Sequence, residues 1–183
     1  YRGQILGEGE GRLDLPSGIA TDESGNVYVS DRGDSRVRKF GADGTYLAGW
    51  GSAGSGDGQF MVPSGIAVDP AGNVYVADGL NHRVQKFSPG GEYLTQWGGL
   101  GSEDGRFRWP AGIAVSPNGS IVYVADAQNH RIQLFTSSGA FISSFGGLGS
   151  RPATFLFPSG LAMCADGELL VSEAGGDRVQ KFS

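Results

Sequence analysis

Cysteine is nearly absent from this chain, since Cys164 is the only one in 183 residues. A lone cysteine excludes an internal disulfide framework, and in mid-chain it predicts a small buried apolar side chain, not a nucleophile. Histidine is almost as scarce, with only His82 and His130, so a zinc site made of three histidines is excluded. No apolar run approaches the roughly 18 residues that cross a bilayer as a helix.

The chain has no surplus of positive charge. Fourteen Lys and Arg residues stand against nineteen Asp and Glu residues, for a net charge of −5, which excludes a broad basic surface for nucleic acid. Glycine is what the chain has in abundance: 33 Gly and 8 Pro residues, without the Gly-X-Y period of collagen. The glycines recur at fixed places, and we therefore expect many tight turns within one domain, residues 1–183.

Internal repetition is the strongest signal in the sequence. Four segments align with PSGIAVDPAGNVYVADGLNHRVQKF, and they begin at Pro16, Pro63, Pro110 and Pro158. These starts are 47 (16 to 63), 47 (63 to 110) and 48 (110 to 158) residues apart. A repeat this regular indicates one structural unit that is used four times.

Each unit predicts four short strands separated by turns. In the second unit the strands are GIAV, VYVA, RVQKF and EYLTQW, with the turns DPAGN, DGLNH and SPGG between them. The second strand is almost continuously apolar, as in a sheet that is covered on both faces. Such sheets stacked radially around an axis form a β-propeller, so we expect an all-β propeller of four four-stranded blades.

The two ends of the chain complete this prediction. The fourth unit stops after Phe182, where its outer strand would begin. Tyr1–Ile5 has the same aromatic-to-bulky spacing as the fourth strand Tyr46–Trp50. We therefore expect Tyr1–Ile5 to be the outer strand of the last blade, which would leave no exposed sheet edge there. Because the chain begins with Tyr1 and not with Met, a processed chain and an excerpt of a longer one both stay open.

At these residues the chain resembles the NHL-repeat family over essentially its whole length. The shared residues are P-x-G-I-A-V-D-x-x-G-N-V-Y-V-A-D-x-x-N-H-R-V-Q-K-F, and units two and three match them almost completely. The resemblance implies a propeller, usually of about six blades, in a family with RNA-binding, protein-binding, bacterial surface and sensor domains and a zinc-dependent amidating lyase. With four units, a small closed ring, an excerpt of a larger ring and a half-ring completed by another chain all stay open. Fold alone does not choose among these functions.

An acid and an arginine recur five residues apart in every unit. The pairs are Asp31 and Arg36, Asp78 and Arg83, Asp126 and Arg131, and Glu173 and Arg178. The intervening histidine occurs only in units two and three, as His82 and His130. Short acids in turns accept hydrogen bonds from the backbone, so we interpret each pair as a structural strut that braces its blade, and the histidines as turn residues.

An enzyme is one alternative function, for example a propeller hydrolase or lactonase-like enzyme with a metal ion in the central channel. It needs carboxylates or histidines that converge on the axis. The residues that follow the first strand of each unit are Asp22, Asp69, Ser116 and Cys164, so only two of these four positions carry an acid. No G-x-S-x-G motif is present to position a serine nucleophile. We expect no catalytic residue, no bound metal and no cofactor.

Binding of single-stranded RNA is the second alternative, and it needs basic grooves with aromatic stacking platforms. The best candidate is RFRWP, residues 106–110, with two arginines and a tryptophan before the third unit. The other units hold Asp14, Met61 and Leu156 at the position of its second arginine. An acid, a thioether, a base and an aliphatic side chain do not form an RNA surface, and we expect no nucleic-acid partner.

The repeat position that holds Asp14, Met61, Arg108 and Leu156 varies, while its neighbours on both sides stay apolar. Such variation predicts exposed residues at the mouth of the propeller. We expect a binding face for a protein, a small ligand or a glycan there, formed by these positions and the turns after the second strands. Its candidate residues are Asp14, Met61, Leu80, Arg108, Trp109, Gln128 and Leu156. The triplet NGS at Asn118–Ser120 also has the form of an N-glycosylation acceptor.

We therefore expect a non-catalytic binding or scaffold module built from NHL repeats. A variant is a building block of an extracellular or cell-surface assembly, in which Tyr1–Ile5 completes a neighbouring subunit instead of its own. A monomeric ring and self-assembly through strand pairing both stay open, and the sequence assigns no compartment.

Overall fold

β-Strands make up most of the regular structure. The structure is a computed structural model that describes residues 9–183, and the predicted closing strand Tyr1–Ile5 lies outside the described residues. The helical elements of the described part are three single turns, η1 (Gly9–Gly11), η2 (Gly79–Asn81) and η3 (Ala127–Asn129). Within residues 9–183, no helix is long and apolar enough to span a membrane.

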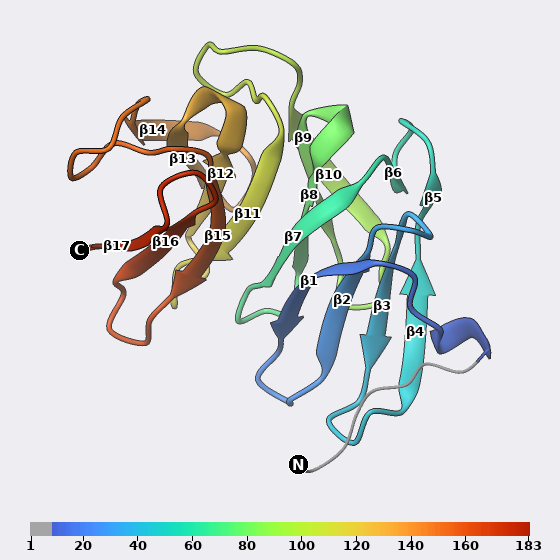
Figure 1. The fold of residues 1–183 in the computed structure, drawn as a ribbon. Coiled ribbons are helices and arrows are strands. Elements are labelled where there is room, and N and C mark those ends of the chain that lie inside the picture. Colours follow the sequence, from blue (N-terminus) through green and yellow to red (C-terminus); the bar gives the residue numbers. More distant parts are fainter. Residues whose placement is uncertain (1–8) are drawn as a thin grey trace.

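The longer strands form four antiparallel sheets, which we call blades 1 to 4 in chain order (Figure 1). Blade 1 contains β1 (Pro16–Thr21), β2 (Val27–Asp31), β3 (Arg36–Phe40) and β4 (Tyr46–Trp50). Blade 2 contains β7 (Pro63–Val68), β8 (Val74–Asp78), β9 (Arg83–Phe87) and β10 (Tyr93–Gly98). Blade 3 contains β11 (Pro110–Val115), β12 (Ile121–Asp126), β13 (Arg131–Thr136) and β14 (Phe141–Gly146). Among the described residues, blade 4 contains β15 (Pro158–Met163), β16 (Leu169–Glu173) and β17 (Arg178–Phe182).

Each strand pairs with the next one along the chain, as the short turns of the repeat require. In blade 2, Val74 lies opposite Phe87 and Asp78 opposite Arg83. The single extra residue of the third unit lengthens β12, which has six pairs with β13 where β8 and β9 have five. A short parallel pair, β5 (Ser52–Ala53) with β6 (Gln59–Phe60), connects blade 1 to blade 2.

The first strand of every blade lies innermost, and these inner strands pack side by side. β1 packs on β7, β7 on β11, and β11 on β15, so the blades follow one another around a common axis (Figure 1). This arrangement confirms the prediction of an all-β propeller with four blades. Within residues 9–183, β15 and β1 do not pack on each other in this way.

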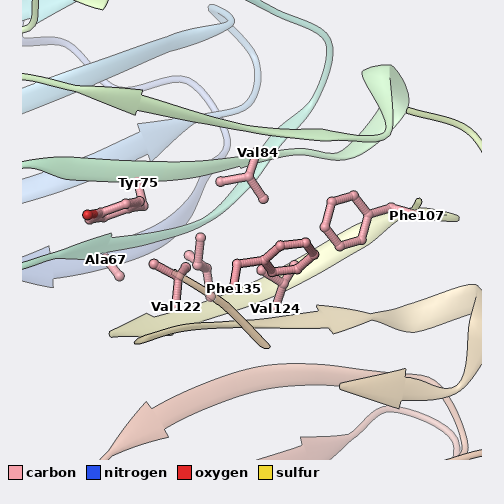
Figure 2. Close-up of a cluster of buried hydrophobic side chains, with 8 residues drawn as sticks. Ala67, Tyr75, Val84, Phe107, Val122, Val124 and Phe135 are labelled. Carbon is pink, nitrogen blue, oxygen red and sulfur yellow. The ribbon is translucent and has the colours of Figure 1, made fainter. Parts of the chain in front are cut away.

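The hydrophobic core consists of three layers, one between each two consecutive blades. Figure 2 shows the layer in which Tyr75 and Val84 of blade 2 meet Phe107 and Phe135 of blade 3. All four side chains are buried. Each blade therefore has two packing faces. We call the face that contacts the preceding blade its rear face, and the face that contacts the following blade its front face.

The inner strands approach one another so closely that they require glycine. A Cβ atom on Gly65 of blade 2 would lie 2.4 Å from the carbonyl oxygen of Ala111 and 2.8 Å from the nitrogen of Ile113 in blade 3. Beside it, Ser64 Oγ donates a hydrogen bond to the Pro110 carbonyl of blade 3 at 3.1 Å. The contact between consecutive blades is thus made by backbone near the axis and by apolar side chains farther out.

Substitution of Gly65 by alanine should destabilise the protein by about 1–3 kcal/mol, because the added methyl group overpacks a backbone contact. Gly90→Ala is the matched control, since a Cβ on this exposed glycine would have only Ser88 Oγ near it, at 3.7 Å. Neither glycine has a left-handed backbone, so sterics alone separate the two variants. Urea unfolding measures the difference, and equal stabilities would contradict the close approach of the blades.

Candidate binding face

A buried acid stands at the end of the second strand of every blade. In blade 2 this acid is Asp78, which is fully buried. Its carboxylate accepts hydrogen bonds from the Met61 N–H at 2.7 Å, Asn81 Nδ2 at 2.8 Å and Arg83 Nε at 2.9 Å. Gln85 Nε2 lies 3.3 Å away as a fourth donor, and the acid of blade 3 has four equivalent partners. The acid therefore ties three parts of its blade together: the turn after the second strand, the third strand, and the three residues before the first strand. We call these three residues the entry segment (residues 13–15, 60–62, 107–109 and 155–157).

The arginine partner is the same in three blades and different in one. Arg83, Arg131 and Arg178 donate from Nε to Asp78, Asp126 and Glu173 at 2.9, 2.9 and 2.6 Å. Blade 1 differs from the prediction, because Arg36 is exposed and Arg38 forms the ion pair with Asp31. Side chains alternate along a strand, so positions 36 and 38 share a face and Arg38 reaches the same carboxylate. Where blade 1 has Arg38, the other blades have glutamine, namely Gln85, Gln133 and Gln180. This difference is visible in the sequence, but a prediction that pairs each acid with the arginine five residues later does not use it.

The environment of these acids shifts their pKa values in opposite directions. Burial raises the pKa of Asp31 and of Asp78 above the usual aspartate value, although hydrogen bonds and the neighbouring arginine act against it. Burial also acts to raise the pKa of Glu173, but the hydrogen bonds from Arg178, the Leu156 N–H and Gln180 together bring it below the usual value. The acid of blade 4 is thus held in its charged form more strongly than its counterpart in blade 2.

The variable position of the repeat (residues 14, 61, 108 and 156) is held through its backbone, and in blades 2 and 3 its side chain is exposed. Met61 donates its N–H to Asp78, and its carbonyl accepts a hydrogen bond from the Leu80 N–H at 3.0 Å. Arg108 donates its N–H to the acid of blade 3, and its carbonyl accepts one from the Gln128 N–H at 3.1 Å. The side chains of Met61, Leu80, Arg108 and Gln128 are all exposed. The entry segment and the turn after the second strand therefore present their side chains together.

Blades 1 and 4 repeat this arrangement. Asp14 and Leu156 donate their N–H groups to the acids of their own blades. Their carbonyls accept hydrogen bonds from the turn residues Gly33 and Gly175 at 2.7 and 3.0 Å. Asp14 is exposed and Leu156 is half-buried. The predicted residues of the binding face thus occupy equivalent places in the four blades, and the face itself remains a prediction.

The residue after each variable position has a left-handed backbone. Leu15, Val62, Trp109 and Phe157 have φ values of 56°, 59°, 60° and 54°. Residues other than glycine rarely adopt this conformation, and for β-branched Val62 it is least favourable. Strain of this kind, of order 1–3 kcal/mol, persists only where the surroundings impose it. The hydrogen bonds made by the N–H and the carbonyl of the variable residue impose it here, so the backbone of the candidate face is held by bonds within each blade.

The two histidines connect consecutive blades. His82 Nδ1 accepts a hydrogen bond from the Trp109 N–H, and His130 Nδ1 accepts one from the Phe157 N–H, both at 3.2 Å. The histidines lie in turns, and their carbonyls also accept hydrogen bonds from the N–H groups of Gly99 and Gly147, in the connections to the next blades, at 2.7 and 2.8 Å. Trp109 is half-buried, and its ring lies next to Gly79 in the preceding blade. Trp109 therefore packs between blades and is less available to a partner than Arg108 beside it.

The central channel is lined by the inner strands of all four blades. Residues 17–19, 64–66, 111–113 and 159–161 surround a cavity of ≈ 260 Å³. Asp69, one of the acids considered for an enzyme, accepts hydrogen bonds from Asn73 in its own turn and from the Tyr75 hydroxyl on β8. In the described part of the chain, no three His, Cys, Asp or Glu side chains are grouped so that they could hold a metal ion. Cys164 is half-buried.

The sequence model of the NHL-repeat family matches residues 13–40, 60–87 and 107–135 of this chain. These segments run from the entry segment to the end of the third strand in blades 1, 2 and 3. The chain belongs to the NHL-repeat family. In this NHL-repeat protein the fourth blade lies outside the matched segments, yet it has the same strand order and the same pairing of acid and arginine. No curated protein sequence matches the chain.

Solved structures similar to this NHL-repeat protein share its shape with little of its sequence. A chain of hydrazine synthase from Kuenenia stuttgartiensis has a TM-score of 0.71 and 18% identity, over 99% of this chain and 49% of that chain. A chain of a nidogen/laminin complex has a TM-score of 0.68 and 19% identity, over 93% of this chain and 61% of that chain. At such identities the likeness shows the fold alone, and this protein spans about half of the first chain and three-fifths of the second.

Arg83 and Arg36 occupy the same position of the repeat in opposite environments, which makes them a matched pair. Arg83→Met leaves the buried carboxylate of Asp78 without its cation and should lower the free energy of unfolding by about 3–5 kcal/mol. Arg36→Met removes an exposed side chain and should change it by less than about 0.5 kcal/mol. Urea unfolding at neutral pH measures both variants. Similar losses in the two would contradict the assignment of Arg38 as the partner of Asp31.

The opposite pKa shifts predict opposite responses to acid. The pKa of Glu173 is lowered, so its stabilising contribution is present above its usual value of 4.5 and is lost as the pH falls. The pKa of Asp78 is raised, so its contribution is present below its usual value of 3.8 and is lost as the pH rises. As the pH falls, the free energy of unfolding of the native protein minus that of Glu173→Gln should decrease. The free energy of unfolding of the native protein minus that of Asp78→Asn should increase. Urea unfolding over roughly pH 3–6 tests this, and two differences that move in parallel would refute it.

Proposed function

We propose that this NHL-repeat protein is a non-catalytic binding module that recognises another protein through its candidate binding face. The strongest support is that, at the variable position, the backbone is hydrogen-bonded in the same way in every blade while the side chain differs from blade to blade. In each blade the N–H and the carbonyl of this residue are both bonded within the blade, while the side chain differs. A backbone that is already ordered reduces the entropy lost on binding. The face can therefore vary its chemistry without altering the fold.

The middle of this face is apolar on one blade and basic on the next. Met61 and Leu80 are each 43% exposed, and the backbone hydrogen bond between them brings them together. Arg108 and Gln128 form the corresponding exposed pair in blade 3. A partner with an apolar side chain over Met61 and a carboxylate beside Arg108 would use both blades at once. A segment of a protein carries these two groups at a suitable distance.

The structural relatives are compatible with a binding role and with an enzyme. One similar chain comes from a complex named for two proteins, nidogen and laminin, and the other from a synthase. We favour binding because the inner strands present mainly Ser, Gly and apolar residues to the channel. The carboxylate of Asp69 is engaged by its own turn, and Asp22 makes the same bonds in blade 1.

Selection from a random peptide library on the immobilised protein tests the proposal. We expect the selected peptides to combine an apolar residue with an acid. Met61→Ser and Arg108→Ser should each weaken their binding about tenfold or more, which corresponds to a loss of about 1.4 kcal/mol. Leu94→Ser is the matched control, because Leu94 is 48% exposed on β10, outside the face. Fluorescence anisotropy measures the affinities.

Two outcomes would contradict a protein-binding face. In the first, Leu94→Ser weakens binding as much as Met61→Ser does, so that the peptides bind elsewhere. In the second, the protein selects no peptide and instead binds a single-stranded RNA pool or a glycan array, and Arg108→Ser abolishes that binding. The second outcome would keep the face but assign it to a different class of ligand.

A further inference from the structure

The turn between β11 and β12 carries the triplet Asn118, Gly119 and Ser120. It has the form Asn-x-Ser, with a middle residue other than proline, that N-linked glycosylation requires. The other three blades have Ser24, Ala71 and Asp166 at the position of Asn118, so the repeat does not require an asparagine there. The side chains of Asn118 and Ser120 are both exposed, and the triplet is therefore within reach of an enzyme.

The fold uses only the oxygen of the Asn118 side chain. Oδ1 accepts a hydrogen bond from the Ser120 N–H at 3.1 Å and one from each of the Ser116 and Ser120 hydroxyls, both at 2.7 Å. A backbone N–H can only donate, so the side-chain atom that it faces is the oxygen of the amide. Within residues 9–183, Nδ2 donates no hydrogen bond. The nitrogen, which is the atom that takes a sugar, is therefore not engaged by the fold.

A comparison with blade 2 shows why this turn needs the oxygen. In blade 2 the carboxylate of Asp69 accepts hydrogen bonds from the N–H and the side chain of Asn73. Ser116 replaces this acid in blade 3, and its hydroxyl accepts one from the Ile121 N–H at 3.0 Å. The Asn118 oxygen supplies the second acceptor of the turn. Because this structural role belongs to the oxygen, a substituent on the nitrogen leaves the turn intact.

A polar hollow of ≈ 430 Å³ borders Asn118 between blades 2 and 3. Its lining includes Asn73 and Lys86 of blade 2 and Ser137 of blade 3. The ammonium group of Lys86 has three N–H donors, and it donates to the Ser137 carbonyl at 3.1 Å and lies 5.1 Å from the centre of the Tyr75 ring. The remaining donors suit the hydroxyl and acetamido oxygens of a sugar.

We propose that Asn118 is an acceptor of an N-linked glycan, whose first N-acetylhexosamine lies in this hollow beside Lys86. In the transfer, Nδ2 forms a bond to C1 of the sugar, and the bond from C1 to the diphosphate oxygen of a lipid-linked oligosaccharide breaks. The lipid diphosphate leaves with the electron pair, and one amide proton passes to a base of the transferase. Asn118 precedes β12 and Gln128 follows it, so the glycan lies at the end of the blade opposite the candidate binding face and does not cover that face.

Secretion of the whole chain from a eukaryotic cell, behind a leader that is removed, brings the chain to the transferase. Mass spectrometry of the peptide that contains Asn118 should find a glycan in the native chain and almost none in Ser120→Ala. Ser116→Ala is the matched control, because it removes the other hydroxyl that bonds to the same oxygen but keeps the triplet, and it should stay glycosylated. A native peptide without a glycan would overturn the proposal, and so would a glycan that persists in Ser120→Ala.

Trimming the glycan to one sugar with an endoglycosidase tests the hollow. Compared with the same chain made in bacteria that lack the transferase, this sugar should raise the urea concentration at the unfolding midpoint, and by less in Lys86→Met. Lys39→Met is the matched control, since Lys39 bonds to the Pro89 carbonyl in the same way over Tyr28, next to Ala71 and not Asn118. Taking the gain within each variant cancels the contacts that the lysine itself loses. An equal gain in all three chains would show that the sugar lies outside the hollow.

Discussion

The buried carboxylate at the end of each second strand is the interaction on which the rest of the repeat depends. In blade 2, Asp78 collects hydrogen bonds from the entry segment, the turn and the third strand. A buried acid without such donors would be strongly destabilising. Because the donors come from three segments that are separate along the chain, satisfying the carboxylate also sets the positions of those segments relative to one another.

The functional surface follows from this constraint. The N–H group that the carboxylate binds belongs to the variable residue, and the next residue, Val62 in blade 2, is thereby held with a left-handed backbone. The part of the repeat that stays constant is therefore the part that positions the variable one. A side chain such as that of Met61 or Arg108 can change without disturbing a hydrogen bond, which is the property that a recognition surface needs.

Contacts between blades depend on a second set of features. Gly65 permits the inner strands to approach, His82 bonds across to the next entry segment, and aromatic residues such as Phe107 fill the layers between sheets. Every one of these contacts requires a neighbouring blade. The first and last blades therefore expose, at Ile19 and Val179, the same kinds of side chain that the middle blades bury.

The sequence by itself determined the repeat, the strand order within a blade and the positions of the buried acids, because spacing and alternation of apolar residues depend only on local geometry. It also separated the constant positions from the variable ones. Only the tertiary structure decided that Arg38 and not Arg36 pairs with Asp31, that the histidines bond to the next blade, and that Ile19 and Val179 are exposed. These features depend on which segments meet in space, and residues distant in sequence carry no local signal of their contact.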